Sequence, residues 1–174
     1  MVIYPVDTLK TATVSEYDNL KGWGRLNYGE KPVFFHRRQG RKFFVSAQRR
    51  RAAFLCDALL CGRDPIIGEE VWFLPEQGNG QMRAGLWGYS SDLRELWAKY
   101  DEKRLLAEPK RDISPEEVKA LLASSICLDS NRRRVWIKDG IEVAMLHRTS
   151  GELVVYESSG YRLRRFFTGN GKRL

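Results

Sequence analysis

The residues best suited to chemistry in this sequence are aromatic and basic side chains interleaved with glycine. Residues 21–26 read KGWGRL, and after a short turn residues 33–36 read VFFH. If both stretches are strands, alternation places Trp23 and Arg25 on one face and Phe34 and His36 on one face. Aromatic side chains on a sheet can stack nucleobases for about 1–3 kcal/mol each, and glycine lets a nucleic-acid backbone approach. The pattern therefore predicts a surface that binds single strands.

The positive charge of the chain is concentrated in the same region. Lys and Arg total 30 against 22 Asp and Glu, which gives a formal net charge of +8. Residues 21–55 contain ten basic residues and one acid, and so carry +9, while the other 139 residues sum to −1. A basic segment of this density indicates a polyanionic partner, either RNA or single-stranded DNA.

Short strands separated by glycine-bearing turns are predicted between residues 10 and 90. The predicted strands are 10–17, 22–28, 32–37, 69–74 and 81–87. The long insertion at 38–67 is predicted to contain a helix that Ser46 caps and that ends near Cys61. Arg49, Arg50 and Arg51 fall in its first turns, where the helix dipole disfavours cations. Because cations are unfavourable at these positions, their presence suggests that the three arginines serve a function.

The remainder of the chain is predicted to be helical first and then β. An amphipathic helix is expected at 91–108, and a second begins at Ser114, where Ser-Pro-Glu-Glu combines an N-cap, a first-turn proline and a capping glutamate. After Asp129 the period changes to two, with hairpin turns between strands at 135–137, 142–147, 153–156 and 161–167. We expect a mainly β chain with helices: a domain at 10–90, a helical connector at 91–130 and a small antiparallel β-meander at 131–170.

The order of the motifs between residues 10 and 90 resembles the cold-shock domain. The first motif of that family runs Lys-Gly-aromatic-Gly-Phe-Ile and its second runs Val-Phe-Val-His-Phe, to which residues 21–26 and 33–37 are similar. Residues 13–18, 68–73 and 78–84 look like its first strand, its fourth strand and the start of its fifth. The resemblance implies a five-stranded OB-type barrel that binds single-stranded RNA or DNA.

Three positions depart from the family pattern. Glu16 stands where the family has a stacking tryptophan, Arg25 where it has the second phenylalanine of the first motif, and Arg37 where phenylalanine follows the histidine. Because arginine can both stack on a base and pair with a phosphate, we expect binding to shift from stacking towards charge, including to structured RNA. The expected binding residues are Tyr17, Lys21, Trp23, Arg25, Phe34, His36, Arg37, Arg38, Arg41, Lys42, Arg49, Arg50 and Arg51.

Other interpretations of the same residues stay open. Trp23 and Phe34 also fit the core of a barrel that binds nothing, and Tyr17 fits a half-buried core position. An RNA-recognition-motif fold needs a strand and a helix before its glycine–aromatic signature, but only twenty residues precede Lys21. The acidic middle and the aromatic residues beyond 130 fit a protein-interaction adaptor or ribonucleoprotein subunit, in which the barrel is a scaffold and the C-terminal module binds a protein. Residues 161–167 interleave arginines with aromatics, which fits a second polyanion contact.

Motifs for catalysis and for metal binding are missing. The two histidines are far apart in sequence, the three cysteines lack zinc-site spacing, and neither a P-loop nor a Gly-x-Ser-x-Gly elbow is present. We therefore expect a non-catalytic protein without a cofactor. The apolar runs are too short to span a bilayer, the N-terminus does not resemble a signal peptide, and an odd number of cysteines fits free thiols. These features predict a cytoplasmic protein without a membrane partner.

Overall fold

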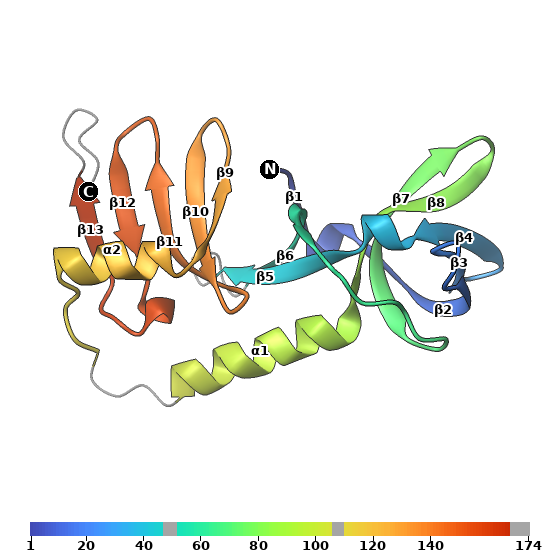
Figure 1. Ribbon diagram of the computed structural model, residues 1–174, viewed down its shortest axis with the longest axis horizontal. Coiled ribbons are helices and arrows are strands. Elements are labelled where there is room, and N and C mark those ends of the chain that lie inside the picture. The colour runs from blue at the N-terminus through green and yellow to red at the C-terminus, as the bar shows by residue number, and fades with distance from the viewer. Residues whose placement is uncertain (47–51, 106–109, 168–174) are drawn as a thin grey trace. The chain divides into compact units, whose positions relative to one another are not determined.

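The computed structural model describes residues 1–46, 52–105 and 110–167 (Figure 1). This part of the chain is mainly β, as expected, with two α-helices. It forms two compact units. The first, which we call the barrel unit, contains residues 2–43 and 53–95, and the second unit contains the other described residues.

The barrel unit is built on five strands that close on themselves in the order β2-β3-β4-β8-β7. Neighbouring strands pair antiparallel except β4 and β8, which pair in parallel, and β7 closes the ring on β2. Leu26, Val33 and Phe73 are fully buried inside because apolar residues alternate with outward-facing ones. The predicted five-stranded barrel is confirmed, with strands at β2 (Lys10–Asp18), β3 (Trp23–Tyr28), β4 (Lys31–His36), β7 (Glu70–Gly78) and β8 (Gln81–Tyr89).

A β-bulge in β2 sets which side chains of that strand face the core. The register between β2 and β3 shifts between Val14 and Glu16, and the Ser15 hydroxyl donates a hydrogen bond to the Arg25 carbonyl at 3.1 Å. Opposite the bulge, Gly24 lies so close to the Glu16 carbonyl and the Phe35 ring that a Cβ would collide with both. An extra residue reverses the alternation that follows it.

The core of the barrel is organised around Trp87. Its ring meets Phe35 and Tyr89 edge-on, with centroids 5.3 and 5.1 Å apart, and its indole N–H donates to the His36 carbonyl at 2.9 Å. Such edge-to-face pairs add to the stabilisation that burial provides. The hydrogen bond ties the end of β4 to the core, next to the outward-facing His36 side chain.

The prediction of a helix within the insertion at 38–67 is wrong. Residues Arg41–Ser46 form β5 and Ala52–Leu60 form β6, while Arg49, Arg50 and Arg51 lie outside the described residues. Most buried apolar residues of this segment are consecutive, Phe43 to Val45 and Ala53 to Cys56, and Leu59 is buried as well. Short continuous apolar runs fit a strand covered on both faces as well as a helix, and periodicity alone does not separate them. β6 pairs antiparallel with β1 (Ile3–Pro5).

The second unit is a β-sheet with α2 on one face (Figure 1). Val118 and Leu121 of α2 (Pro115–Ala123) are buried against Trp136, Val143 and Leu153 of the sheet. The predicted capping box is present, since Ser114 accepts from the Glu117 N–H and the Glu117 carboxylate accepts from the Ser114 N–H. The helix expected at 91–108 is α1 (Ser90–Leu105), whose residues are divided between the two units.

The sheet of the second unit contains more than the meander expected at 131–170. Its strands β9 to β13 pair antiparallel in chain order, and Val45 of β5 pairs in parallel with Ile141. The bounds are β9 (Ile126–Asp129), β10 (Arg133–Lys138), β11 (Ile141–His147), β12 (Glu152–Val155) and β13 (Arg164–Phe167). Within the described ranges, neither helix has the length and apolarity needed to cross a membrane.

Replacing Gly24 with alanine tests the close contact at the bulge. The added Cβ would lie 2.7 Å from the Phe35 ring, so we expect Gly24→Ala to lower the free energy of unfolding by about 1–3 kcal/mol, as overpacking does. Gly62→Ala is the matched control, because nothing lies within 4 Å of its would-be Cβ. Urea denaturation followed by circular dichroism measures both, and equal stability of the two variants would contradict the contact.

Candidate functional site

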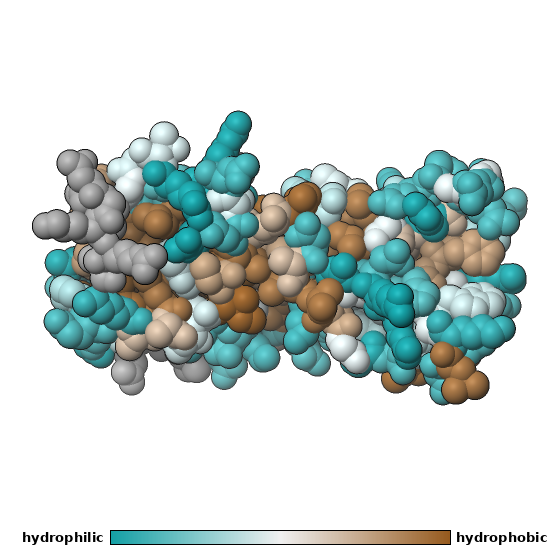
Figure 2. Space-filling model, turned by 45° about the horizontal axis from the view of Figure 1, so that its top comes forward, coloured by the Kyte–Doolittle hydropathy of each residue, from teal (hydrophilic) through white to brown (hydrophobic). Residues whose placement is uncertain are grey.

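The outward side chains of β3 and β4 bring together four of the predicted binding residues. Trp23 pairs with His36 and Arg25 with Phe34 across the two strands, and the Arg25 guanidinium carbon lies 5.2 Å from the Phe34 ring centre. Trp23 is 37% exposed, and the other three are partly exposed. We call these four residues the outer face. In Figure 2, the visible surface of the barrel unit is mostly hydrophilic, with some apolar residues among the hydrophilic ones.

One line of outward side chains crosses four strand pairings of the barrel, and we call it the cross-barrel row. Glu16 pairs with Arg25, Arg25 with Phe34, Phe34 with Arg83, and Arg83 with Glu76. Each arginine faces a carboxylate, at 3.7 Å for Arg25–Glu16 and 3.5 Å for Arg83–Glu76. Arg83 and Glu76 were not among the binding residues predicted from the sequence. The sequence signal for Arg83 was alternation, because apolar Met82, Ala84 and Leu86 occupy every second position and leave Arg83 on the other face.

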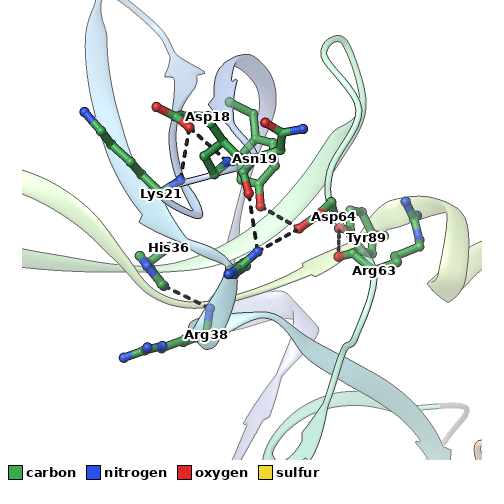
Figure 3. Close-up of polar contacts among 11 residues, drawn as sticks. Asp18, Asn19, Lys21, His36, Arg38, Arg63, Asp64 and Tyr89 are labelled. Atoms are coloured by element: carbon green, nitrogen blue, oxygen red, sulfur yellow. Dashed lines mark hydrogen bonds and ion pairs between the residues drawn. The ribbon is translucent and has the colours of Figure 1, made fainter.

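The His36 side chain is oriented by the turn that follows β4. Its Nδ1 accepts a hydrogen bond from the Arg38 N–H at 3.1 Å, at the start of a short 3-10 helix, Arg37–Gln39 (Figure 3). With Nδ1 as the acceptor, the neutral imidazole carries its proton on Nε2. His36 therefore offers a hydrogen-bond donor at its outer edge. The Arg38 side chain takes no part in this bond and is exposed.

The Arg37 side chain holds the turn between β2 and β3. Its side chain lies over Gly22, donates to the Asn19 carbonyl at 3.4 Å and lies 3.9 Å from the Asp64 carboxylate. The same turn is fixed by Asp18, which accepts from the Lys21 N–H at 3.0 Å (Figure 3). The Lys21 side chain points away from this network and is exposed (Figure 3).

The other predicted cations of residues 38–51 have different surroundings. The Arg41 guanidinium donates to the carbonyls of Asp57, Arg38 and Gly40 at 2.6–2.9 Å, which is a structural arrangement. Lys42 is exposed on β5. Arg49, Arg50 and Arg51, also predicted to bind, lie outside the described residues.

Tyr17 faces the barrel core instead of the outer face. Its ring stacks on Phe35 with centroids 6.0 Å apart, and its hydroxyl donates to Asp64 at 2.6 Å. Burial and this carboxylate raise the pKa of Tyr17 to about 12. The reason for its position is the bulge at Ser15, which turns Glu16 outward and Tyr17 inward.

Arg63 and Tyr89 anchor the segment that carries Asp64. The Arg63 guanidinium carbon lies 3.4 Å from the Tyr89 ring centre, Arg63 donates to Glu69 at 2.9 Å, and the Tyr89 hydroxyl donates to the Arg63 carbonyl at 2.9 Å (Figure 3). Burial raises the pKa of Tyr89, so its hydroxyl stays protonated as this donor.

The arginines of residues 161–167, expected as a second polyanion contact, all have local partners. Arg162 lies 3.9 Å from Asp112 and Arg165 donates to Glu152 at 2.9 Å. Arg164 donates to the Ile113 carbonyl at 2.9 Å and lies over the Phe166 ring. These contacts hold β13 and the segment before α2 in place.

No group of three or more His, Cys, Asp or Glu side chains in the described ranges is arranged to hold a metal ion. Comparisons with known proteins were made at three levels. No protein-family model matches the sequence, and the searches of curated proteins and of solved structures likewise found no match. The assignment of a function therefore depends on the geometry of the outer face.

A Tyr17→Phe substitution tests the structural role of the Tyr17 hydroxyl. The phenylalanine keeps the ring on Phe35 but removes the bond to Asp64, so we expect the free energy of unfolding to fall by about 0.5–1.5 kcal/mol. Urea denaturation measures the change. Tyr28→Phe, on the same barrel, is the matched control. An unchanged stability would contradict the role that we give to the hydroxyl.

Proposed function

We propose that the outer face binds single-stranded nucleic acid, RNA or DNA, without catalysing a reaction. The observation that carries the proposal is the exposure of Trp23, Phe34 and His36 on two adjacent strands whose alternate residues already fill the core. The barrel does not need these rings for its own packing. Exposed aromatic side chains on neighbouring strands are a stacking platform for successive bases.

The cations around this platform support the same proposal. Lys21, two residues before β3, and Arg38, two residues after β4, each present an exposed side chain. Phosphates of a strand lying on the outer face would meet these cations, which supply affinity without reading sequence. Glu16 and Asp18 lie beside Arg25 and Trp23, so we assign more of the binding to stacking than the charge of residues 21–55 suggests.

The connectivity of the barrel supports an OB fold of the cold-shock type. Numbered along the chain, its strands run 1-2-3-5-4 and close on strand 1, with strands 3 and 5 parallel, which is compatible with an OB fold. In OB folds, oligonucleotides bind on the face of strands 2 and 3. Here these strands are β3 and β4, which carry the two motifs. We also propose a cytoplasmic location, which the free thiols of Cys56, Cys61 and Cys127 favour.

Removing the Trp23 ring tests the stacking platform. We expect Trp23→Ala to weaken binding of a fluorescently labelled octanucleotide about 5- to 150-fold, the loss of one stacked base, and to leave duplex binding nearly unchanged. Trp97→Ala on α1 is the matched control, since Trp97 is also partly exposed but belongs to the other unit. Fluorescence anisotropy measures the affinities. Equal losses for single strand and duplex would count against stacking.

Removing the Arg38 charge tests the phosphate contacts. The Arg38 side chain is exposed and the His36 bond uses only the Arg38 main chain, so Arg38→Gln keeps the site geometry. We expect weaker binding of all sequences and a slope of log affinity against log salt that is smaller by about 0.7. Lys119→Gln on α2 is the control. An unchanged slope for Arg38→Gln would remove Arg38 from the interface.

A further inference from the structure

The cross-barrel row places an arginine on each side, in strand register, of one partly exposed aromatic residue. Phe34 lies between Arg25 on β3 and Arg83 on β8, and each arginine is followed outward by a glutamate, Glu16 or Glu76. Stacking alone would need only the ring. Four charged groups that flank it in the order acid, base, base and acid can also distinguish what lies on the ring.

Both ion pairs of the row leave hydrogen-bond donors available to a ligand. The nitrogen–oxygen distances of 3.7 and 3.5 Å exceed the 2.7–3.2 Å typical of hydrogen bonds. The Arg25 and Arg83 side chains are 41% and 58% exposed. The carboxylates therefore restrain the guanidinium groups by charge without using up their terminal N–H groups, whereas the Arg25 Nε is buried.

Two glycines let the Arg83–Glu76 pair lie flat on the barrel. A Cβ at Gly85 would collide with the Glu76 carboxylate, and one at Gly78 would lie 3.3 Å from the Arg83 guanidinium carbon. The pair therefore occupies space that side chains at these positions would fill. This seating holds the Arg83 guanidinium beside Glu76 on β7, while the Arg83 backbone pairs with Phe34 on β4.

The chemistry of the row fits a purine base, and it fits guanine better than adenine. The Arg25 guanidinium lies over the Phe34 ring, 5.2 Å from its centre, so a purine that stacks on this ring would meet Arg25, and Arg83 is on the strand at the other side. Guanine offers O6 and N7, two adjacent acceptors for an arginine fork, whereas adenine offers one acceptor beside a donor. The N–H groups of guanine can also donate to a glutamate. We propose that the cross-barrel row selects a guanine stacked on Phe34 within a single strand, an inference that rests on the proposed function.

Four labelled octamers of uridine, with U, A, C or G at the fourth position, test the preference by fluorescence anisotropy. We expect the G octamer to bind about 5- to 150-fold more tightly than the others, the range for one bidentate arginine–guanine contact. A fifth octamer with 7-deazaguanine lacks N7 and should lose at least fivefold relative to guanine. Equal binding of the five octamers, or tighter binding of A or C, would overturn the guanine assignment.

Variants that keep the charge show whether the row is responsible. Arg25→Lys and Arg83→Lys remove the planar fork but not the cation, so each should lower the ratio of the G-octamer affinity to the U-octamer affinity. Arg94→Lys is the matched control, since Arg94 is also exposed and 3.9 Å from a glutamate. A preference that persists when both row arginines are replaced overturns the assignment, provided that circular dichroism shows the variant to be folded.

The outcomes separate this inference from the proposed function. If none of the octamers binds, the proposed function itself fails. If all bind with one affinity that Trp23→Ala weakens, the outer face binds single strands and only the guanine selection is wrong.

Discussion

The barrel depends on the close approach of β3 to β2, where Gly24 lies beneath the Glu16 carbonyl with no room for a side chain. This contact accompanies the bulge at Ser15, which reverses the sidedness of β2 after Val14. Val14 and Tyr17 consequently face the core, and Glu16 faces outward beside Arg25. The composition of the surface, and so its chemistry, follows from this one backbone contact.

The alternation of β3 and β4 could be predicted from sequence, because Gly24 and Leu26 on β3, and Val33 and Phe35 on β4, are apolar and two positions apart. The inward turn of Tyr17 could not, since a bulge adds a residue without changing composition. The insertion was misjudged for a related reason: consecutive apolar residues at 43–45 and 53–56 show no period that distinguishes a buried strand from a helix. Arg83 was missed because its neighbour Phe34 is 49 residues away in sequence, and only barrel closure makes them adjacent.

The charges of the basic segment act in several different ways. Arg37 and Arg41 hydrogen-bond to main-chain carbonyls and hold turns, whereas Lys21, Arg38 and Lys42 present exposed side chains. Arg25 is balanced by Glu16. A net charge of +9 over residues 21–55 therefore overstates the number of cations available to phosphates. We conclude that the aromatic rings carry more of the proposed interaction than the charge density suggests.

The central claim is that single strands lie on the outer face of the barrel. Nuclear magnetic resonance of the ¹⁵N-labelled protein, titrated with a G-containing octanucleotide, tests it most directly. The account predicts that the Trp23 indole N–H and the amides of β3 and β4 shift, while those of α2 and β13 do not. Shifts confined to α2 and β13, or no shifts at oligonucleotide concentrations that saturate binding, would contradict it.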